Sequence, residues 1–112
     1  MATQKETMDF ILERLNPLGE VSAKKMFGEY GVYYEGKMIA LVSDDQLFVK
    51  PSESGRTFIG DPEEAPPYPG AKNWFYISEE KWEDANWLQK LILVTAPEVA
   101  LPVKKKPKKQ TQ

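Results

Sequence analysis

The sequence contains neither cysteine nor histidine among its 112 residues. Without cysteine, disulfides, thiolate metal sites and cysteine nucleophiles are excluded, and the composition fits a reducing compartment. Without histidine, the commonest general base near neutral pH and the commonest metal ligand are both missing. Ser-His-Asp and Cys-His catalysis are therefore excluded within this chain, and we expect no metal and no cofactor.

Long apolar runs are also absent. No stretch approaches the roughly 20 apolar residues that a membrane-spanning helix needs. The first residues, Met-Ala-Thr-Gln-Lys-Glu, lead into a charged amphipathic segment and not into the apolar core of a secretory signal. We therefore expect a cytoplasmic protein, and a length of 112 residues predicts one domain.

Charge is distributed unevenly along the chain. Residues 1–102 carry ten Lys/Arg and seventeen Asp/Glu, a net charge of −7, whereas residues 103–112 carry five lysines and no acid. The first part should repel nucleic acid and the second should attract polyanions. We predict a folded domain over residues 1–102 and a disordered Lys-rich tail over 103–112, because that segment cannot form a core.

A first helix is predicted near the N-terminus. Four apolar residues recur there at helical spacing: Met8, Ile11, Leu12 and Leu15. They form one stripe, and Thr3 followed by Glu6 is typical of a capping box. Residues 16–19, Asn-Pro-Leu-Gly, should end the helix.

Strands and helices are predicted to follow in a simple order. Four β-rich segments come first, at residues 23–27, 31–35, 37–43 and 46–50. The later ones are joined by turns of about two residues, which require antiparallel pairing. A short helix at 52–59, a Pro-rich loop at 60–70, a strand at 73–77, a helical turn at 79–82 and a last helix at 84–95 complete the pattern. The prediction is an α+β fold: a two-layer arrangement of an antiparallel sheet of four to five strands with helices packed on it.

Two candidate chemical sites have simpler structural interpretations. Gly28 and Gly31 follow a lysine pair, but their spacing fits neither a Walker loop nor a dinucleotide fingerprint, and we interpret them as positions for a bend or bulge between strands. Seven acids are spread over turns and loops: Glu29, Glu35, Asp44, Asp45, Asp61, Glu63 and Glu64. We interpret these as solvated side chains, with Asp44 and Asp45 in a tight turn.

Aromatic residues allow more than one interpretation. Nine are candidates: Tyr30, Tyr33, Tyr34, Tyr68, Trp74, Phe75, Tyr76, Trp82 and Trp87. Core packing is the main expectation, a protein interface the second, and base stacking the third, since interleaved basic residues are lacking. The residues chosen as a candidate partner surface are Tyr30, Tyr68 and Trp74.

The lysine run near the C-terminus is a real electrostatic feature, with five positive charges in six residues: Lys104, Lys105, Lys106, Lys108 and Lys109. Such a run can contact DNA, RNA or an anionic membrane through counterion release. It can equally serve as a solubilising tail with no specific partner, and both interpretations stay open.

Residues 25–42, Lys-Met-Phe-Gly-Glu-Tyr-Gly-Val-Tyr-Tyr-Glu-Gly-Lys-Met-Ile-Ala-Leu-Val, resemble the opening of the N-terminal domain of the TfoX/Sxy competence regulators. Residues 46–50, 65–68 and 82–84 are similar to later parts of that domain, so the resemblance covers about residues 5–96. It implies the same two-layer fold, similar to secretion-chaperone-like domains, and no catalytic residues. In full regulators a second, helical domain follows, whereas only a short segment follows Thr95 here.

Three classes of function follow from the sequence. The first is a non-enzymatic, cytoplasmic interaction or regulatory accessory module with an unknown protein partner, and a homodimer is left open. The alternative is a weak, sequence-independent nucleic-acid-associated protein that acts through its Lys tail. An enzyme is the third, and without histidine its base would have to be Asp, Glu, Lys or Tyr.

Overall fold

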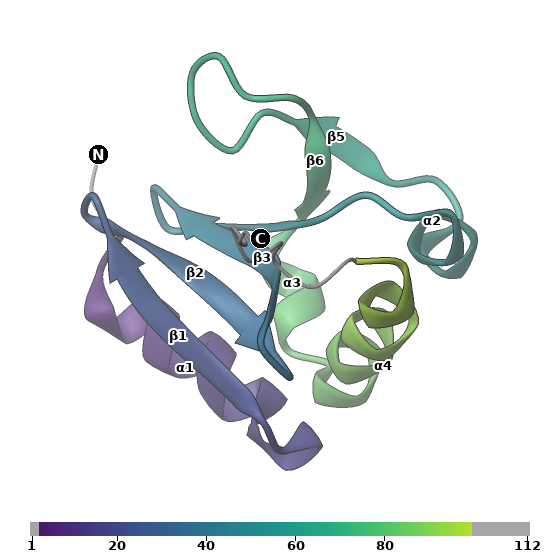
Figure 1. The fold of residues 1–112 in the computed structure, drawn as a ribbon, viewed down its shortest axis with the longest axis horizontal. Coiled ribbons are helices and arrows are strands. Elements are labelled where there is room, and N and C mark those ends of the chain that lie inside the picture. Colours follow the sequence, from purple (N-terminus) through teal and green to yellow (C-terminus); the bar gives the residue numbers. More distant parts are fainter. Residues whose placement is uncertain (1–2, 100–112) are drawn as a thin grey trace, which may run out of the picture.

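A computed structural model describes residues 3–99. The sheet has six strands in the order β1-β2-β3-β4-β6-β5, and every neighbouring pair is antiparallel (Figure 1). The strands are β1 (Val21–Met26), β2 (Glu29–Tyr34), β3 (Lys37–Ser43), β4 (Gln46–Val49), β5 (Glu63–Ala65) and β6 (Trp74–Ile77). The helices are α1 (Lys5–Leu15), α2 (Glu53–Ile59), α3 (Glu79–Trp82) and α4 (Ala85–Thr95), with 3-10 turns at Asn16–Leu18 and Ala96–Glu98.

The α+β fold with helices on an antiparallel sheet is therefore confirmed, but the expected number of four to five strands is wrong. The additional strand is β5, which lies inside the predicted loop at 60–70. Its three residues, Glu-Glu-Ala, have little β propensity, and the strand exists because β6 supplies a partner for each of them. The predicted tail at 103–112 lies outside the described residues.

Helix α1 has the predicted apolar stripe, but its N-terminal cap differs from the prediction. Met8, Ile11 and Leu15 are buried along one face. The expected capping box is wrong, because the N-cap is Gln4 and no side chain caps the helix. The hydroxyl oxygen of Thr3 instead accepts a hydrogen bond from the backbone amide of Asp45 at 3.2 Å and lies 3.1 Å from the backbone oxygen of Val42, which ties the start of the chain to the sheet.

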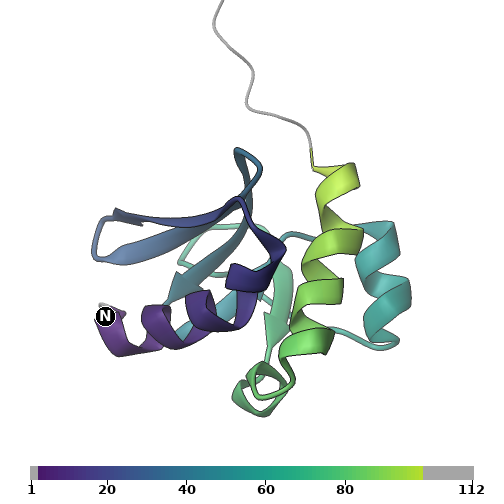
Figure 2. The same ribbon diagram turned by 90° about the horizontal axis from the view of Figure 1, so that it is seen from below.

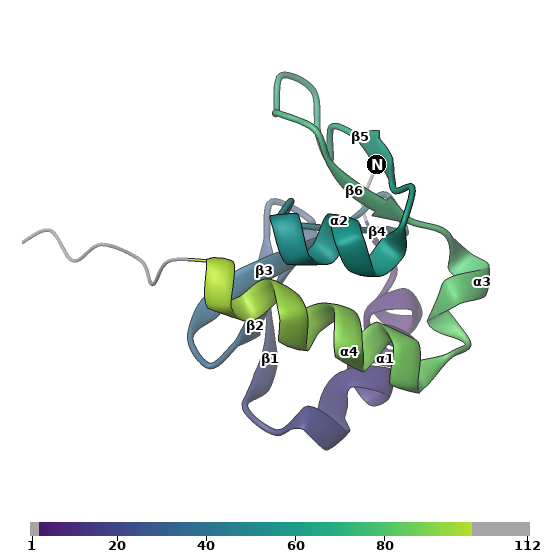
Figure 3. The same cartoon turned by 90° about the vertical axis from the view of Figure 1, so that its right-hand side faces the viewer.

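Helices α2 and α4 pack side by side against the sheet (Figure 3). Ser52 caps α2 by accepting a hydrogen bond from the Gly55 amide at 2.9 Å, and Asp84 caps α4 by accepting from the Trp87 amide at 3.1 Å. A Cβ on Gly55 would lie 2.7 Å from the hydroxyl oxygen of Ser52, whereas Phe75 and Thr95 would be at 3.4 Å. Gly55 has low helix propensity, but its lack of a side chain leaves room for the Ser52 cap.

The core lies between the sheet and the helices. One row of directly opposed residues runs across the whole sheet on that face: Ala23, Val32, Ala40, Val49, Phe75 and Glu64. Leu88, Leu91 and Ile92 of α4 belong to the same buried cluster. A register shift opposite Val32 and Tyr33 leaves Ile39 as an extra residue in β3, so that Ile39 and Ala40 are both fully buried although they are adjacent.

Candidate functional site

The second face of the sheet carries its own row of residues, which is apolar at its centre. Directly opposed residues on this face are Lys24, Gly31, Leu41, Phe48, Tyr76 and Glu63. Directly opposed residues project to the same side, and none of these six belongs to the core cluster. Within residues 3–99 the helices lie on the other side of the sheet (Figure 2). This second face is called the open face below.

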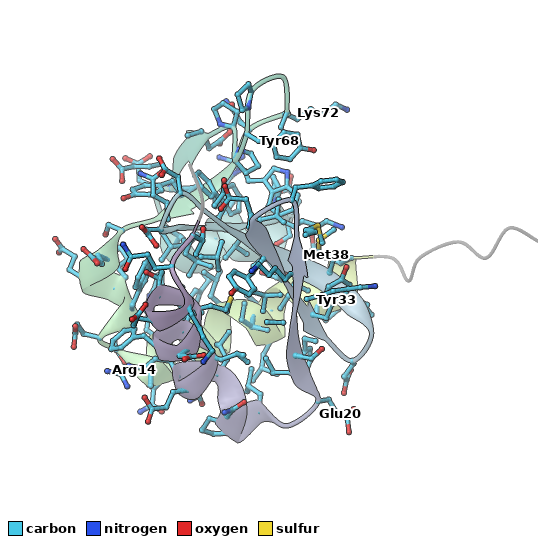
Figure 4. All side chains as sticks on the ribbon, turned by 90° about the vertical axis from the view of Figure 1, so that its left-hand side faces the viewer. Arg14, Glu20, Tyr33, Met38, Tyr68 and Lys72 are labelled. Carbon is cyan, nitrogen blue, oxygen red and sulfur yellow. The ribbon has the colours of Figure 1, made fainter. Side chains whose placement is uncertain are left out.

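A groove of about 930 Å³ runs over the open face. Leu41 and Phe48, at the centre of the sheet, form its floor and are 7% and 3% exposed. Met26 and Met38 line the groove on the side of β1 to β3, and the Pro-rich segment 66–69 between β5 and β6 lines it as well. Figure 4 shows Met38 and Tyr68 projecting to the same side of the sheet, away from Arg14 of α1. The groove is therefore a concave apolar surface that the chain's own helices leave uncovered.

Gly31 allows the two methionines to lie across the sheet. A Cβ at this position would lie 2.8 Å from Cε of Met26 and 3.1 Å from Sδ of Met38. Gly31 is itself buried, so the methionine side chains cover its backbone. Methionine is flexible and polarisable and adapts to different apolar ligands, which suits this wall to binding.

The turn between β1 and β2 presents Phe27 at the rim of the groove. Phe27 and Gly28 are its two central residues, with φ angles of 51° and 82°. A two-residue hairpin with both φ positive favours Asn-Gly or Asp-Gly, and a bulky residue in this region is strained. The Phe27 side chain is nevertheless 100% exposed while it lines the groove. Such local strain clusters at functional sites.

The rim of the groove near this turn is acidic. The Glu29 carboxylate accepts hydrogen bonds from the hydroxyl of Thr3 and, at 3.0 Å, from the backbone amide of Asp44. Within residues 3–99 no basic group lies within 4.0 Å of the carboxylate of Glu29 or Asp44. Farther along the sheet, the Lys50 ammonium lies 5.9 Å from the centre of the Trp74 ring, a cation–π contact.

Most side chains that line the groove are apolar. The carboxyl groups with perturbed pKa values lie elsewhere: the Gln4 amide and the Thr7 hydroxyl lower the pKa of Asp45, and Ser54 and the Glu53 amide lower that of Glu98. Both are explained by these hydrogen bonds at a turn and at a helix end. Among residues 3–99 no group of three or more acidic side chains is arranged to hold a metal.

A smaller hollow of about 590 Å³ lies between α1 and α3. Phe10 and Trp82 form its apolar part, and four glutamates surround it: Glu6, Glu79, Glu80 and Glu83. All four are exposed to solvent. The open-face groove, with its buried apolar floor, is the better candidate site.

Comparison with known proteins assigns the family. A profile of the TfoX N-terminal domain matches residues 13–96. The chain belongs to the TfoX N-terminal domain family. An uncharacterized 12.7 kDa protein encoded in the trpE 5′ region of Spirochaeta aurantia is 34% identical over 111 residues, which cover 99% of this chain and 96% of that protein.

Membership in the TfoX N-terminal domain family confirms the resemblance seen in residues 25–42 and supports a competence-regulator-like module. The family is not a known enzyme family. All groove-lining residues, from Met26 to Trp74, fall inside the matched segment. No helix within residues 3–99 is long and apolar enough to cross a membrane.

The structure separates the residues that sequence reasoning grouped as a partner surface. Tyr68 and Trp74 both line the groove, and Tyr68 is 56% exposed. Tyr30 lies on the opposite face of the sheet, partly buried against the core. The five lysines of the basic run, Lys104, Lys105, Lys106, Lys108 and Lys109, lie outside the described residues.

Sequence reasoning missed the apolar residues that form much of the groove: Met26, Phe27, Met38, Leu41 and Phe48. Phe27 was expected to end a strand, whereas it occupies the turn. The available signal was the dipeptide Phe27-Gly28, which stands where a tight hairpin favours Asn-Gly. Recognising it requires the strand register, because the strands predicted at 23–27 and 31–35 leave residues 28–30 for the turn.

Proposed function

We propose that this chain is a non-enzymatic interaction module, acting in the cytoplasm as a regulatory accessory protein, and that it binds a partner protein in the open-face groove. The observation that carries the proposal is Phe27. A fully exposed phenylalanine in left-handed backbone conformation contributes nothing to the core and weakens its own turn. A role in binding gives both features a reason, because aromatic side chains anchor protein interfaces.

The groove favours an apolar segment that carries basic residues. Its walls offer Met26, Met38 and Tyr68 to apolar side chains, above the buried floor of the groove. Its acidic rim, with Glu29 and Asp44 free of basic partners within residues 3–99, offers complementary charge to lysine or arginine. Charge complementarity of this kind selects partners and raises association rates.

A random 12-residue peptide library displayed on phage tests this proposal directly. Selection against the full chain should enrich peptides with two or more large apolar residues next to Lys or Arg. Enrichment of acidic peptides, or of none, would contradict the proposed chemistry. The selected peptides are then synthesised, and their affinity is measured through the fluorescence of the protein.

Groove and control variants locate the binding site of those peptides. Met38→Glu places a charge in the wall and should lower peptide affinity at least tenfold. Leu93→Glu is the matched control, because it places the same charge on an exposed apolar residue, 43% accessible, on α4. Equal loss in both variants would place the binding site outside the groove. Circular dichroism establishes that each variant is folded.

A second candidate function rests on the charge distribution. The net charge of −7 over residues 1–102 and of +5 over 103–112 favours weak, sequence-independent nucleic-acid binding through the lysine run. This function would require no groove residue, so the Met38→Glu variant distinguishes the two candidates.

A further inference from the structure

The chain itself carries a segment with the chemistry that the groove favours. Residues 101–109 read Leu-Pro-Val-Lys-Lys-Lys-Pro-Lys-Lys, an apolar part followed by a basic part. We propose that this segment occupies the open-face groove of its own chain and competes there with the partner. The inference rests on the proposed function, because it names a second occupant for the same site.

The described chain ends close to the groove. Lys37 donates a hydrogen bond from Nζ to the backbone oxygen of Ala96 at 2.8 Å, and the next residue in β3 is Met38, in the wall of the groove. Glu98 accepts hydrogen bonds from the amides of Glu53 and Ser54, which fixes the last turn. The C-terminal end of α4 points to the side on which β1 and β2 lie (Figure 2).

The remaining chain is long enough to run the full length of β3. Strand β3 runs from Lys37 to Ser43, which is about 23 Å at 3.3 Å per residue. Residues 100–109 can span at most about 33–36 Å. Leu101 and Val103 can therefore reach Met38 and Leu41, while the lysines can reach the acidic rim.

Charge gives the segment a direction in the groove. Strand β3 ends next to Asp44. Within residues 3–99, the carboxylates of Asp44 and Glu29 have no basic partner. Exposed ion pairs contribute little each, so the contact should be weak and sensitive to salt. An intramolecular segment nevertheless acts at an effective concentration in the millimolar range, which is enough for partial occupancy.

Partial occupancy has a functional consequence. A partner binds only the fraction of molecules whose groove is open, so its apparent affinity falls by that fraction. Replacing the five lysines Lys104, Lys105, Lys106, Lys108 and Lys109 by serine should therefore tighten binding of a groove-selected peptide a few-fold. The change leaves residues 3–99 untouched.

A spin label on the segment tests its location in the full chain. The sequence has no cysteine, so Gln110→Cys provides a single attachment point for a nitroxide. The readout is the NMR signal of the methionine methyl groups. Met26 and Met38 line the groove, and Met8, buried in α1 at 2% exposure, is the internal control on the other face of the sheet.

The proposal predicts broadening of the Met26 and Met38 methyl signals without broadening of Met8, and recovery of the signals in 1 M salt or in the serine variant. Equal broadening of all three methyls, or none, would overturn it. Broadening that appears only when labelled chains are mixed with separate isotope-labelled chains would place the segment in the groove of a second copy and would also overturn it.

The two proposals can fail separately. If the selected peptides bind in the groove but the spin label gives no specific broadening, the proposed interaction module stands and the proposed docking of the chain's own segment is wrong. If the label broadens Met26 and Met38 but no library peptide binds, the groove serves this chain's own segment, and the proposed partner site is wrong.

Discussion

A Cβ atom on Gly31 would lie 2.8 Å from Cε of Met26, so the absence of a side chain at residue 31 determines how the methionine lies on the open face. Gly31→Ala should push Met26 and Met38 away from the sheet. Because flexible side-chain ends must shift and the backbone need not, we expect the cost at the lower end of the overpacking range, about 1 kcal/mol.

Peptide binding should be more sensitive to this change than stability is. We expect Gly31→Ala to weaken a groove-selected peptide several-fold in a fluorescence titration, while urea denaturation reports the small loss of stability. Met26→Ala combined with Gly31→Ala should recover part of the stability, because it removes the nearest crowded group. If the two substitutions are additive in stability, crowding by Met26 is not the cause.

Substitution of two adjacent residues of α4 tests which face of the helix packs on the core. Ile92 is 1% exposed and Leu93 is 43% exposed. Ile92→Ala should reduce the free energy of unfolding by about 2–5 kcal/mol, as truncation of a buried isoleucine does, whereas Leu93→Ala should change it by less than about 0.5 kcal/mol. Chemical denaturation measures both, and similar losses would contradict the placement of the helix.

The pH dependence of stability should contain a contribution from Glu98. Hydrogen bonds from the Ser54 hydroxyl and amide and from the Glu53 amide lower the pKa of its carboxyl group from 4.5. The unfolded chain therefore binds this proton more tightly, and the carboxylate stabilises the fold above about pH 4.5, with the contribution lost as pH falls through the lowered pKa.

Glu98→Gln should accordingly lower the urea midpoint at pH 7, and the difference from the unmodified protein should shrink below pH 4.5. Glu13→Gln, an exposed position on α1, controls for the loss of one negative charge. A difference between Glu98→Gln and the unmodified protein that stays constant from pH 7 to pH 3 would show that the charge of Glu98 is not the stabilising feature.

The order of most elements could be predicted because local signals are strong. The stripe Met8, Ile11, Leu15 and the tight turn Asp44-Asp45 each depend on neighbouring residues, and both are present in the structure. Strand β5 could not be predicted, since Glu63–Ala65 pairs only because β6 lies beside it.

The candidate site was harder to predict than the fold because it depends on which face each strand residue takes. Tyr30 and Gly31 are adjacent, yet one packs toward the core and the other underlies the groove. The extra residue at Ile39 reverses the alternation inside β3, and apolar composition alone does not reveal it. The contacts of Thr3 could not be predicted either, because its partners Glu29 and Val42 are remote in sequence.

Any nucleic-acid binding should be weak, independent of sequence and carried by the lysine run. Five lysine–phosphate contacts predict a slope of at most about −4.5 in a plot of log affinity against log salt concentration on duplex DNA. The net charge of −7 over residues 1–102 should make the measured slope shallower. Replacing the five lysines by serine should abolish retention on heparin at low salt, and sequence-specific DNA binding by that variant would contradict the prediction.

The most direct test of the binding groove is the variant Phe27→Asn, measured for stability and for binding together. Asparagine tolerates the left-handed conformation and forms the favoured Asn-Gly turn, and Phe27 buries nothing in the fold. We predict that the free energy of unfolding stays constant or rises by up to about 1 kcal/mol, while a groove-selected peptide binds at least tenfold more weakly. Unchanged peptide affinity in this folded variant would contradict the account.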